Sequence, residues 1–258
     1  MRCSKKNYNN SGRNLYMSCV TIAAKATLAM SIMLMILSCE KPKVVGDTKT
    51  APPPKPTPKE TAKPVLKEIL RPGEISLFDG KTLGHWKINE FWKPGKVYVK
   101  DGAIQLETGN DLTGISWQGP LVHMNYEVSL DAMRTKGEDF FCCLTFPVGA
   151  DSCSFVIGGW GGQVVGLSNI DYFDAADNET TQIMSFETGR WYHVRVRVTK
   201  NKIKAWIDKE KMVDVVTTGR KIDIRMEVEE SRPLGVASWQ TGTALRNIRL
   251  KTFIDTQR

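Results

Sequence analysis

WYHVRVRVTKNKIKAWID, residues 191–208, contains two runs in which apolar and polar side chains alternate. In the first run the apolar positions are Tyr192, Val194, Val196 and Val198, and in the second they are Ile203, Ala205 and Ile207. A period of two is typical of a β-strand with one buried face and one wet face. Lys200-Asn201, between the runs, is typical of a tight turn. The stretch therefore predicts an antiparallel hairpin.

The same pattern continues on both sides of this hairpin. Residues 126–132 alternate in the same way, and further short apolar runs fall at residues 140–146, 155–157, 164–167, 234–237 and 245–250. No long stretch has the 3.6-residue period of an amphipathic helix. Many short antiparallel strands within residues 71–258 predict one all-β domain, a two-sheet jelly-roll sandwich of the concanavalin or lectin type.

The first 39 residues resemble a secretory leader. Several basic residues precede the apolar run 26–37, which is shorter than the ~20 apolar residues that cross a bilayer. The run closes with Ile36-Leu37-Ser38-Cys39, which resembles the lipobox of bacterial lipoproteins, whose cysteine is lipidated. We expect residues 1–39 to be a lipoprotein signal peptide, and the protein to be exported and lipid-anchored at Cys39 in the bacterial cell envelope, on the periplasmic or outer-membrane side. Simple cleavage of the leader is the alternative.

Residues 40–70 are rich in proline, lysine and threonine. They offer almost no apolar side chain to a core, so we expect a disordered, extended linker. Residues 1–70 hold 12 of the 36 Lys and Arg and 4 of the 28 Asp and Glu, which leaves 24 of each for residues 71–258. Nucleic-acid-binding domains usually carry a basic face. A neutral domain therefore argues against a nucleic-acid partner, and it leaves the lipid anchor as the membrane contact.

Residues 138–181 concentrate more chemistry than any other stretch. They include the run Gly158-Gly159-Trp160-Gly161-Gly162 and, further on, a loop rich in Asp, Asn and Glu. Glycine serves where a backbone takes a positive φ or approaches another group closely. Trp160 is therefore either a core ring over a tight bend or a ring that faces a ligand. Because an exported protein meets an oxidising compartment, we expect a disulfide between Cys153 and Cys142, or with Cys143 as the alternative.

Blocks at both ends of the domain carry a family resemblance. Near the start these are Phe78-Asp79-Gly80-Lys81-Thr82-Leu83, Gly84-His85-Trp86 and Asp101-Gly102, and near the end Pro233-Leu234-Gly235, Gln240, Gly242 and Leu245-Arg246-Asn247-Ile248-Arg249-Leu250. They resemble the bacterial 3-keto-disaccharide hydrolase family over essentially the whole domain. The resemblance implies a concanavalin-type jelly roll and carbohydrate substrates: glycosides oxidised at C3, cleaved by hydrolysis or by elimination followed by hydration.

Two positions depart from that family. Glu138-Asp139-Phe140 stands where the family usually has Asn-Ser-Gly, and Trp239-Gln240-Thr241-Gly242 stands where it usually has a Gln-x-His-Gly type of sequence. No catalytic residue can be transferred to either position. The chain resembles a divergent branch, with a site rebuilt around residues 138–181.

Carboxylates are the better candidates for chemistry, because the histidines are scattered and no nucleophile, phosphate-loop or dinucleotide motif is present. Two carboxylates can cleave a glycosidic bond, and a 3-ketone acidifies the neighbouring C2 proton, so that one base can begin an elimination. The candidate catalytic residues are Asp139, Asp171, Asp174 and Glu179. Two alternatives remain for the loop: plain solvated turns, or a Ca²⁺ site formed by Asp171, Asp174, Asp177 and Glu179, since Ca²⁺ takes oxygen ligands.

Aromatic rings stack on the faces of sugars, so exposed tryptophans are candidates for substrate binding. Trp160 stands among glycines, whereas Trp191 and Trp206 alternate with the buried positions of their strands. Asn169 and Asn178 are further binding candidates. Two functions follow: a carbohydrate-active enzyme that cleaves 3-keto-glycosides, or a non-catalytic, lectin-like domain that binds glycans or proteins from a tether.

Overall fold

The computed structural model describes residues 73–253. The predicted signal peptide (residues 1–39), the lipidation of Cys39, the whole linker (residues 40–70) and the domain start at Arg71 lie outside this range and stay predictions. Within the described range, no helix has the length and apolar character needed to span a bilayer.

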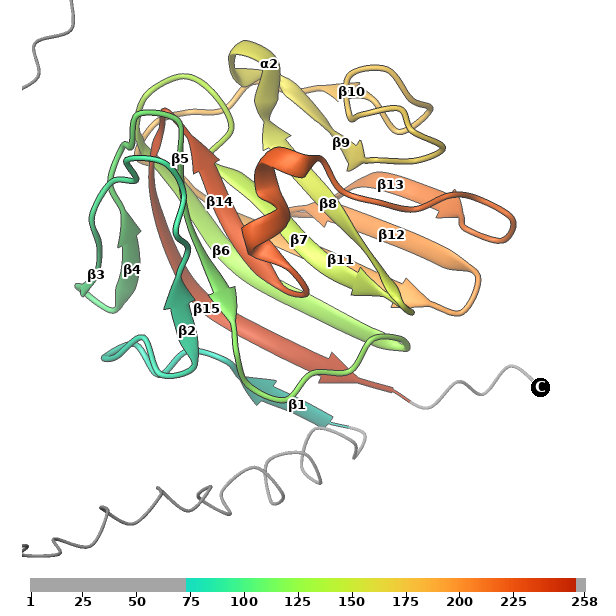
Figure 1. Cartoon of the computed structure of the whole chain (residues 1–258), viewed down its shortest axis with the longest axis horizontal. Helices are drawn as coiled ribbons and strands as arrows, with labels where there is room; N and C mark the ends of the chain where they lie inside the picture. The colour runs from blue at the N-terminus through green and yellow to red at the C-terminus, as the bar shows by residue number, and fades with distance from the viewer. Residues whose placement is uncertain (1–72, 254–258) are drawn as a thin grey trace, which may run out of the picture. The chain divides into compact units, whose positions relative to one another are not determined.

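An eight-stranded antiparallel sheet forms one layer of the molecule (Figure 1). Its order is β13-β12-β11-β6-β15-β4-β3, and β1 also pairs with β15. The strands are β1 (Gly73–Ser76), β3 (Val97–Lys100), β4 (Ala103–Leu106), β6 (Tyr126–Lys136), β11 (Trp191–Thr199), β12 (Lys202–Ile207), β13 (Glu210–Val216) and β15 (Gly242–Thr252). The predicted hairpin is confirmed, because Thr199 lies opposite Lys202 across the β11–β12 turn.

A seven-stranded sheet forms the other layer, in the order β10-β9-β8-β7-β14-β5-β2. Its strands are β2 (Trp86–Ile88), β5 (Leu112–Trp117), β7 (Cys142–Val148), β8 (Asp151–Gly158), β9 (Val164–Ser168), β10 (Gln182–Ile183) and β14 (Gly235–Trp239). The two layers confirm the expected all-β jelly-roll sandwich. The helical elements are the four-residue turn α2 (Gly159–Gly162) and the 3₁₀ helix η1 (Met226–Ser231).

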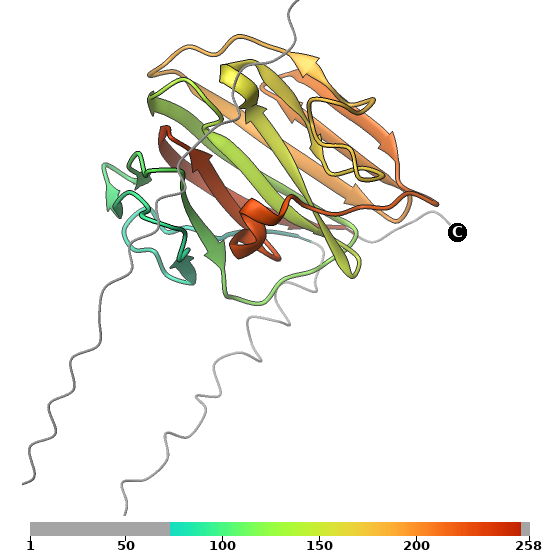
Figure 2. The same cartoon turned by 45° about the horizontal axis from the view of Figure 1, so that its top comes forward.

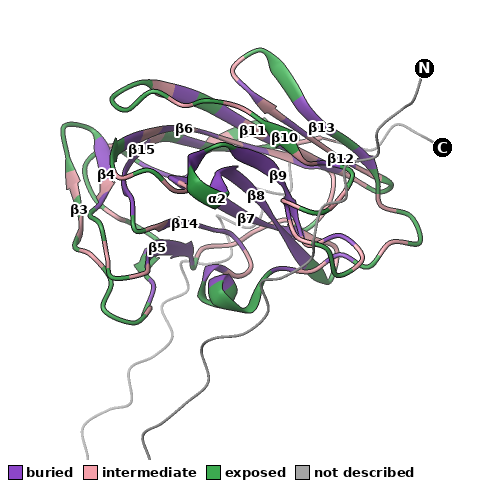
Figure 3. Ribbon diagram, turned by 90° about the horizontal axis from the view of Figure 1, so that it is seen from above, coloured by how far each residue is buried: buried purple, intermediate pink, exposed green. Residues whose placement is uncertain are grey.

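The main hydrophobic core fills the space between the two sheets. Alternate residues of each strand point into it, for example Val194 of β11, Leu144 of β7 and Phe155 of β8, all fully buried. Burying a side chain of this size stabilises the fold by ~1.5–3 kcal/mol. Figure 3 shows the buried residues running along both layers while the turns are largely exposed. The period-two pattern in the sequence thus accounts for the core.

The seven-stranded sheet also buries part of its outer face. Leu112, Cys143, Val156 and Ala237 point outward from β5, β7, β8 and β14 and form a second apolar cluster. The 3₁₀ helix η1 covers this face by packing on β5 and β14, and Figures 1 and 2 both show it in front of the sheet. The outer face of this sheet is therefore concave and partly covered by η1, as a ligand site requires.

Candidate functional site

Trp160 stands at the rim of this outer face, on the turn that follows β8. The backbone of Trp160 is left-handed, with φ 49° and ψ 53°, and 46% of the residue is exposed. A bulky residue rarely takes this conformation, because it costs ~1–2 kcal/mol. Such strain persists only where the surrounding structure imposes it, and it gathers at ligand sites.

The neighbouring glycines explain how the turn is imposed. Gly158, Gly161 and Gly162 all have positive φ, at 75°, 84° and 104°. A Cβ added to Gly162 would overlap the carbonyl oxygen of Glu138, so the turn packs directly on the segment that precedes β7. The amide of Gly161 donates a hydrogen bond to Asp139 Oδ2 at 3.2 Å. The glycine-rich run thus builds a tight bend that leaves the indole ring of Trp160 outside the core.

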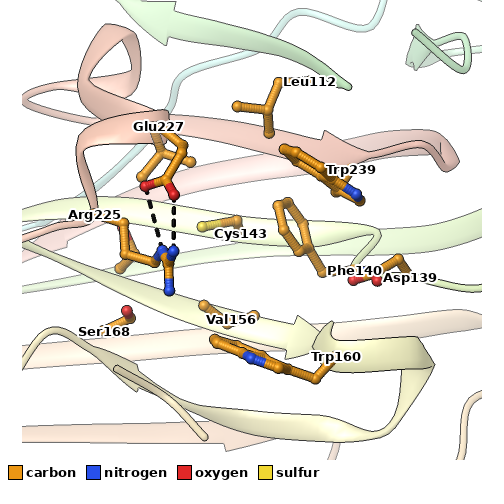
Figure 4. Close-up of a pocket in the computed structure, with 12 residues that line it drawn as sticks. Leu112, Asp139, Phe140, Cys143, Val156, Trp160, Ser168, Arg225, Glu227 and Trp239 are labelled. Carbon is orange, nitrogen blue, oxygen red and sulfur yellow. Dashed lines mark hydrogen bonds and ion pairs between the residues drawn. The ribbon is translucent and has the colours of Figure 1, made fainter. Parts of the chain in front are cut away.

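Two further aromatic rings stand opposite Trp160. Phe140 lies in the segment before β7 and Trp239 is the last residue of β14, and the amide of Trp239 donates to the carbonyl of Phe140 at 3.0 Å. Their ring centroids are 6.4 Å apart at an interplanar angle of 43°. Figure 4 shows the ring of Trp160 on one side of the pocket and the rings of Phe140 and Trp239 on the other, with Cys143 and Val156 between them.

The far end of the pocket is closed by charged side chains. Arg225 donates from Nη2 to Glu227 Oε1 at 2.7 Å (Figure 4). It also donates from Nη1 to Asp174 Oδ2 at 2.7 Å. The hydrogen bonds from Arg225 lower the pKa of Glu227. Glu227 is therefore ionised at neutral pH and poorly suited to act as a general acid.

Asp139 lies at the other end and is half-buried. Its Oδ1 accepts the amide of Phe140 at 2.7 Å, and its Oδ2 accepts the amide of Gly161. Among residues 73–253 it forms no ion pair, unlike Glu227 in the same pocket. Of the four carboxylates predicted to be catalytic, Asp139 is the one that lines this pocket.

Together these groups enclose a pocket of about 210 Å³. The residues that line it are Leu112, Asp139, Phe140, Cys143, Ser154, Val156, Trp160, Ser168, Arg225, Glu227, Val228 and Trp239. Sites for drug-sized ligands measure ~300–1,000 Å³. This pocket is smaller, which suits a ligand of about one sugar ring. Its aromatic walls and polar ends match the two faces of a sugar, which are apolar above and below and polar at the edge.

The acidic loop that follows β9 has a structural role instead. Arg220 forms ion pairs with Asp171 and with Glu179, the latter at 2.6 Å. Hydrogen bonds from the Lys221 amide and from Arg220 lower the pKa of Asp171, and Arg220 lowers the pKa of Glu179. Asp174 pairs with Arg225, while Asp177 is exposed. These carboxylates tie the loop to the segment before η1.

The structure does not gather the four residues of the calcium alternative into a metal-binding group within residues 73–253. Within residues 73–253, no three His, Cys, Asp or Glu side chains come together in a way that could hold a metal ion. The physical reason is that the guanidinium groups of Arg220 and Arg225 neutralise Asp171, Asp174 and Glu179. The sequence suggested a calcium site because it places several oxygen ligands close together. The arginines that pair with these carboxylates lie some fifty residues further along the chain.

The two asparagines named as binding residues also face the protein. Asn178 Nδ2 donates to the carbonyls of Leu167 and Asp174 at 2.8 and 2.7 Å, and its Oδ1 accepts from Thr180. Asn169 accepts from the hydroxyl of Ser168 at 2.8 Å. Neither lines the pocket. Asn178 holds the acidic loop on β9, so its role is to support one wall of the site.

Trp191 and Trp206 lie on the opposite face of the sandwich. Both point away from the core on the eight-stranded sheet, as the alternation indicated. The guanidinium carbon of Arg246 lies 4.0 Å from the ring centroid of Trp191, and that of Arg195 lies 4.1 Å from the ring centroid of Trp206. Arginines cover both rings, and neither ring lines the pocket.

The predicted disulfide is wrong. Cys142, Cys143 and Cys153 are all free and buried. In the register of the β7–β8 hairpin, Cys153 lies opposite Phe146, four residues from Cys142, or ~13 Å along a strand. Cys143 points to the outer face and Cys153 to the core, so that pair is excluded as well. Burial raises the pKa of Cys143 to about 12.

Three residues of the site were missed as candidates. Trp239 has a weak signal, since it lies two residues after Ala237 and therefore on the same face of β14. Arg225 and Glu227 have none, because residues 220–232 show no strand or helix period. Their position depends on contacts between distant segments, such as the backbone hydrogen bonds between Asn169 and Asp223.

Residues 73–251 match the family described as the 3-keto-alpha-glucoside-1,2-lyase-like domain. The chain belongs to this family. This match confirms the family resemblance seen in the sequence. No curated protein matches its sequence.

Several solved structures are similar in fold to this chain. Domain 4 of AbnA, a GH43 extracellular arabinanase from Geobacillus stearothermophilus, is 15% identical, with a TM-score of 0.46 over 70% of this chain and 91% of that one. The carbohydrate-binding module CBM66 from Bacillus subtilis is 10% identical, with a TM-score of 0.44 over 65% and 96%. Crh5 transglycosylase is 10% identical, with a TM-score of 0.49 over 73% and 90%.

Proposed function

We propose that this 3-keto-alpha-glucoside-1,2-lyase-like domain binds carbohydrate in the pocket between Trp160 and Trp239. The observation that carries the proposal is Trp160, a half-exposed indole held in a left-handed turn at the mouth of the pocket. A fold keeps such strain only where something compensates for it. A sugar ring laid on the indole face would supply that compensation in the bound state.

The polar groups of the pocket suit binding better than acid–base chemistry. Arg225 and Glu227 satisfy each other's charges, and the hydroxyls of Ser154 and Ser168 lie on the pocket wall. These groups can exchange hydrogen bonds with sugar hydroxyls without changing protonation. The lowered pKa of Glu227 is the opposite of what a general acid for glycoside cleavage needs.

The test compares two tryptophan variants that sit on opposite faces of the sandwich. Trp160→Ala removes the ring at the pocket, and Trp206→Ala removes a ring of the same kind on the eight-stranded sheet. Binding of methyl glucoside and its 3-keto derivative is measured by calorimetry. We expect Trp160→Ala to weaken binding by at least about tenfold and Trp206→Ala to leave it unchanged. Equal affinities for the two variants would refute the pocket as the site.

Cleavage of a 3-keto-glycoside is the second candidate, favoured by one observation: Asp139 lines the pocket and has no ion-pair partner among residues 73–253. As a base, its carboxylate would take the C2 proton, the electron pair would delocalise onto the C3 carbonyl, and the C1–O bond would then break. Water would protonate the departing oxygen, because Glu227 is ionised. If the domain cleaves such a substrate, Asp139→Asn should lower turnover by ~10²-fold or more.

A further inference from the structure

The charged groups at the pocket are unequal in number. Three line it, Asp139, Arg225 and Glu227, and Asp174 shares Arg225 from the acidic loop. Behind the Trp160 turn, the buried Arg134 lies near Asp139. Arg225 and Arg134 against Asp139, Glu227 and Asp174 give a formal charge of −1. The Cys143 thiol adds none, because burial raises its pKa to about 12.

Both cations already have protein partners. Arg225 places three of its five N–H groups on carboxylates, with Nε and Nη2 on Glu227 and Nη1 on Asp174. A ligand carboxylate that approached Arg225 would therefore be repelled by Glu227 and Asp174, whereas a sugar hydroxyl would not. Arg134 is 6% exposed, donates to the carbonyl of Gly162, and is not part of the pocket lining.

Asp139, by contrast, forms no ion pair with any of the described residues 73–253. Its two oxygens accept one backbone amide each, and a carboxylate has about four lone-pair sites, so acceptor capacity remains. An ammonium group on a bound sugar would form a charge-assisted hydrogen bond there. The face of Trp160, on the turn whose Gly161 amide donates to Asp139, would also attract a cation.

Given that the pocket binds sugar, as proposed above, we propose that it binds an amino sugar more tightly than a neutral sugar of the same size, and a uronic acid least tightly. Asp139 is the residue that determines this order of affinities. The pocket's size limits the choice to one ring, and its charge decides between rings of that size. Specificity then comes as much from repulsion of the acid as from attraction of the amine.

The experiment measures the affinities of methyl glucosaminide, methyl glucoside and methyl glucuronide for the full chain by calorimetry. We expect the glucosaminide to bind about tenfold tighter than the glucoside, and the glucuronide to bind weakest. The preference should shrink as salt rises from about 0.01 M to 1 M, because the Debye length falls from ~30 to ~3 Å. An equal or reversed order of affinities would overturn this proposal and leave carbohydrate binding standing, whereas no binding of any ligand would overturn both.

A variant pair assigns the effect to one carboxylate. Asp139→Asn keeps the side-chain size and removes the charge, and we expect the ratio of glucosaminide to glucoside affinity to fall close to one. Glu138→Gln changes the neighbouring, exposed carboxylate outside the pocket lining, and it should keep the wild-type ratio. Thermal melting checks that both variants fold. A wild-type ratio in a folded Asp139→Asn variant would overturn the role of Asp139.

Discussion

Replacing Gly162 by alanine should damage the Trp160 turn more than the same change at Gly161. Both glycines have positive φ, so each alanine costs ~1–2 kcal/mol of backbone strain. At Gly161 the added methyl meets no atom within 4 Å, whereas at Gly162 it overlaps the carbonyl oxygen of Glu138. Overpacking of this kind adds ~1–3 kcal/mol. We therefore expect unfolding free energies lower by ~1–2 kcal/mol for Gly161→Ala and ~2–5 kcal/mol for Gly162→Ala.

Urea titration gives these free energies, and calorimetry with methyl glucoside gives the effect on the site. If the turn relieves the overlap by moving, the hydrogen bond from the Gly161 amide to Asp139 is lost and Trp160 leaves the pocket rim. Gly162→Ala should then lose sugar binding while Gly161→Ala retains most of it. Equal unfolding free energies for the two variants, or wild-type affinity in Gly162→Ala, would show that the close approach to Glu138 does not position the ring.

Three further predictions concern the rest of the chain. Hydrogen-bond partners lower the pKa of Asp171, Glu179 and Glu227 in the folded state. These three carboxylates therefore stabilise the fold fully when the pH is above their unfolded pKa values of 3.8 and 4.5. That stabilisation is lost as the pH falls through their lower folded pKa values. Urea titrations from pH 7 to 3 should therefore show stability dropping mainly below about pH 4.5, and a drop centred near pH 6 would contradict this. In a shortened chain that begins at Arg71, the three cysteines should resist a thiol reagent when folded and all react after unfolding, and fewer than three reactive thiols would reinstate a disulfide. Mass spectrometry of the mature N-terminus should find a lipid on Cys39, and an unmodified chain that begins elsewhere would refute the anchor.

The sequence predicted the layers of this fold because they depend on local patterns. Alternation at Tyr192, Val194 and Val196 specifies which face of β11 is buried, whatever lies across the core. The same rule correctly turned Trp191 and Trp206 away from the core. The alternation rule could not tell which of the two sheets carries a site on its outer face, because both sheets have an outer face. That depends on η1 and the acidic loop, which cover only the seven-stranded sheet.

The site itself was half predictable. The glycines around Trp160 require an unusual backbone, and that local signal pointed to Trp160, which lines the pocket together with Asp139. Arg225 was beyond reach, because it enters the pocket only after the backbone near Asp223 pairs with Asn169. The same missing information made the acidic loop resemble a calcium site. The disulfide failed for a different reason: its two cysteines are near in sequence, but their register in the hairpin keeps them apart.

The central claim is that sugar binds on the outer face of the seven-stranded sheet, between Trp160 and Trp239. Its most direct test is a nitrogen–proton correlation spectrum of the chain's seven tryptophan indole groups during titration with methyl glucoside, each resonance assigned by single substitution. We predict that the indole resonances of Trp160 and Trp239 shift together and saturably, while those of Trp191 and Trp206 stay in place. Saturable shifts at Trp191 or Trp206, with Trp160 and Trp239 unmoved, would place the site on the eight-stranded sheet and contradict the account.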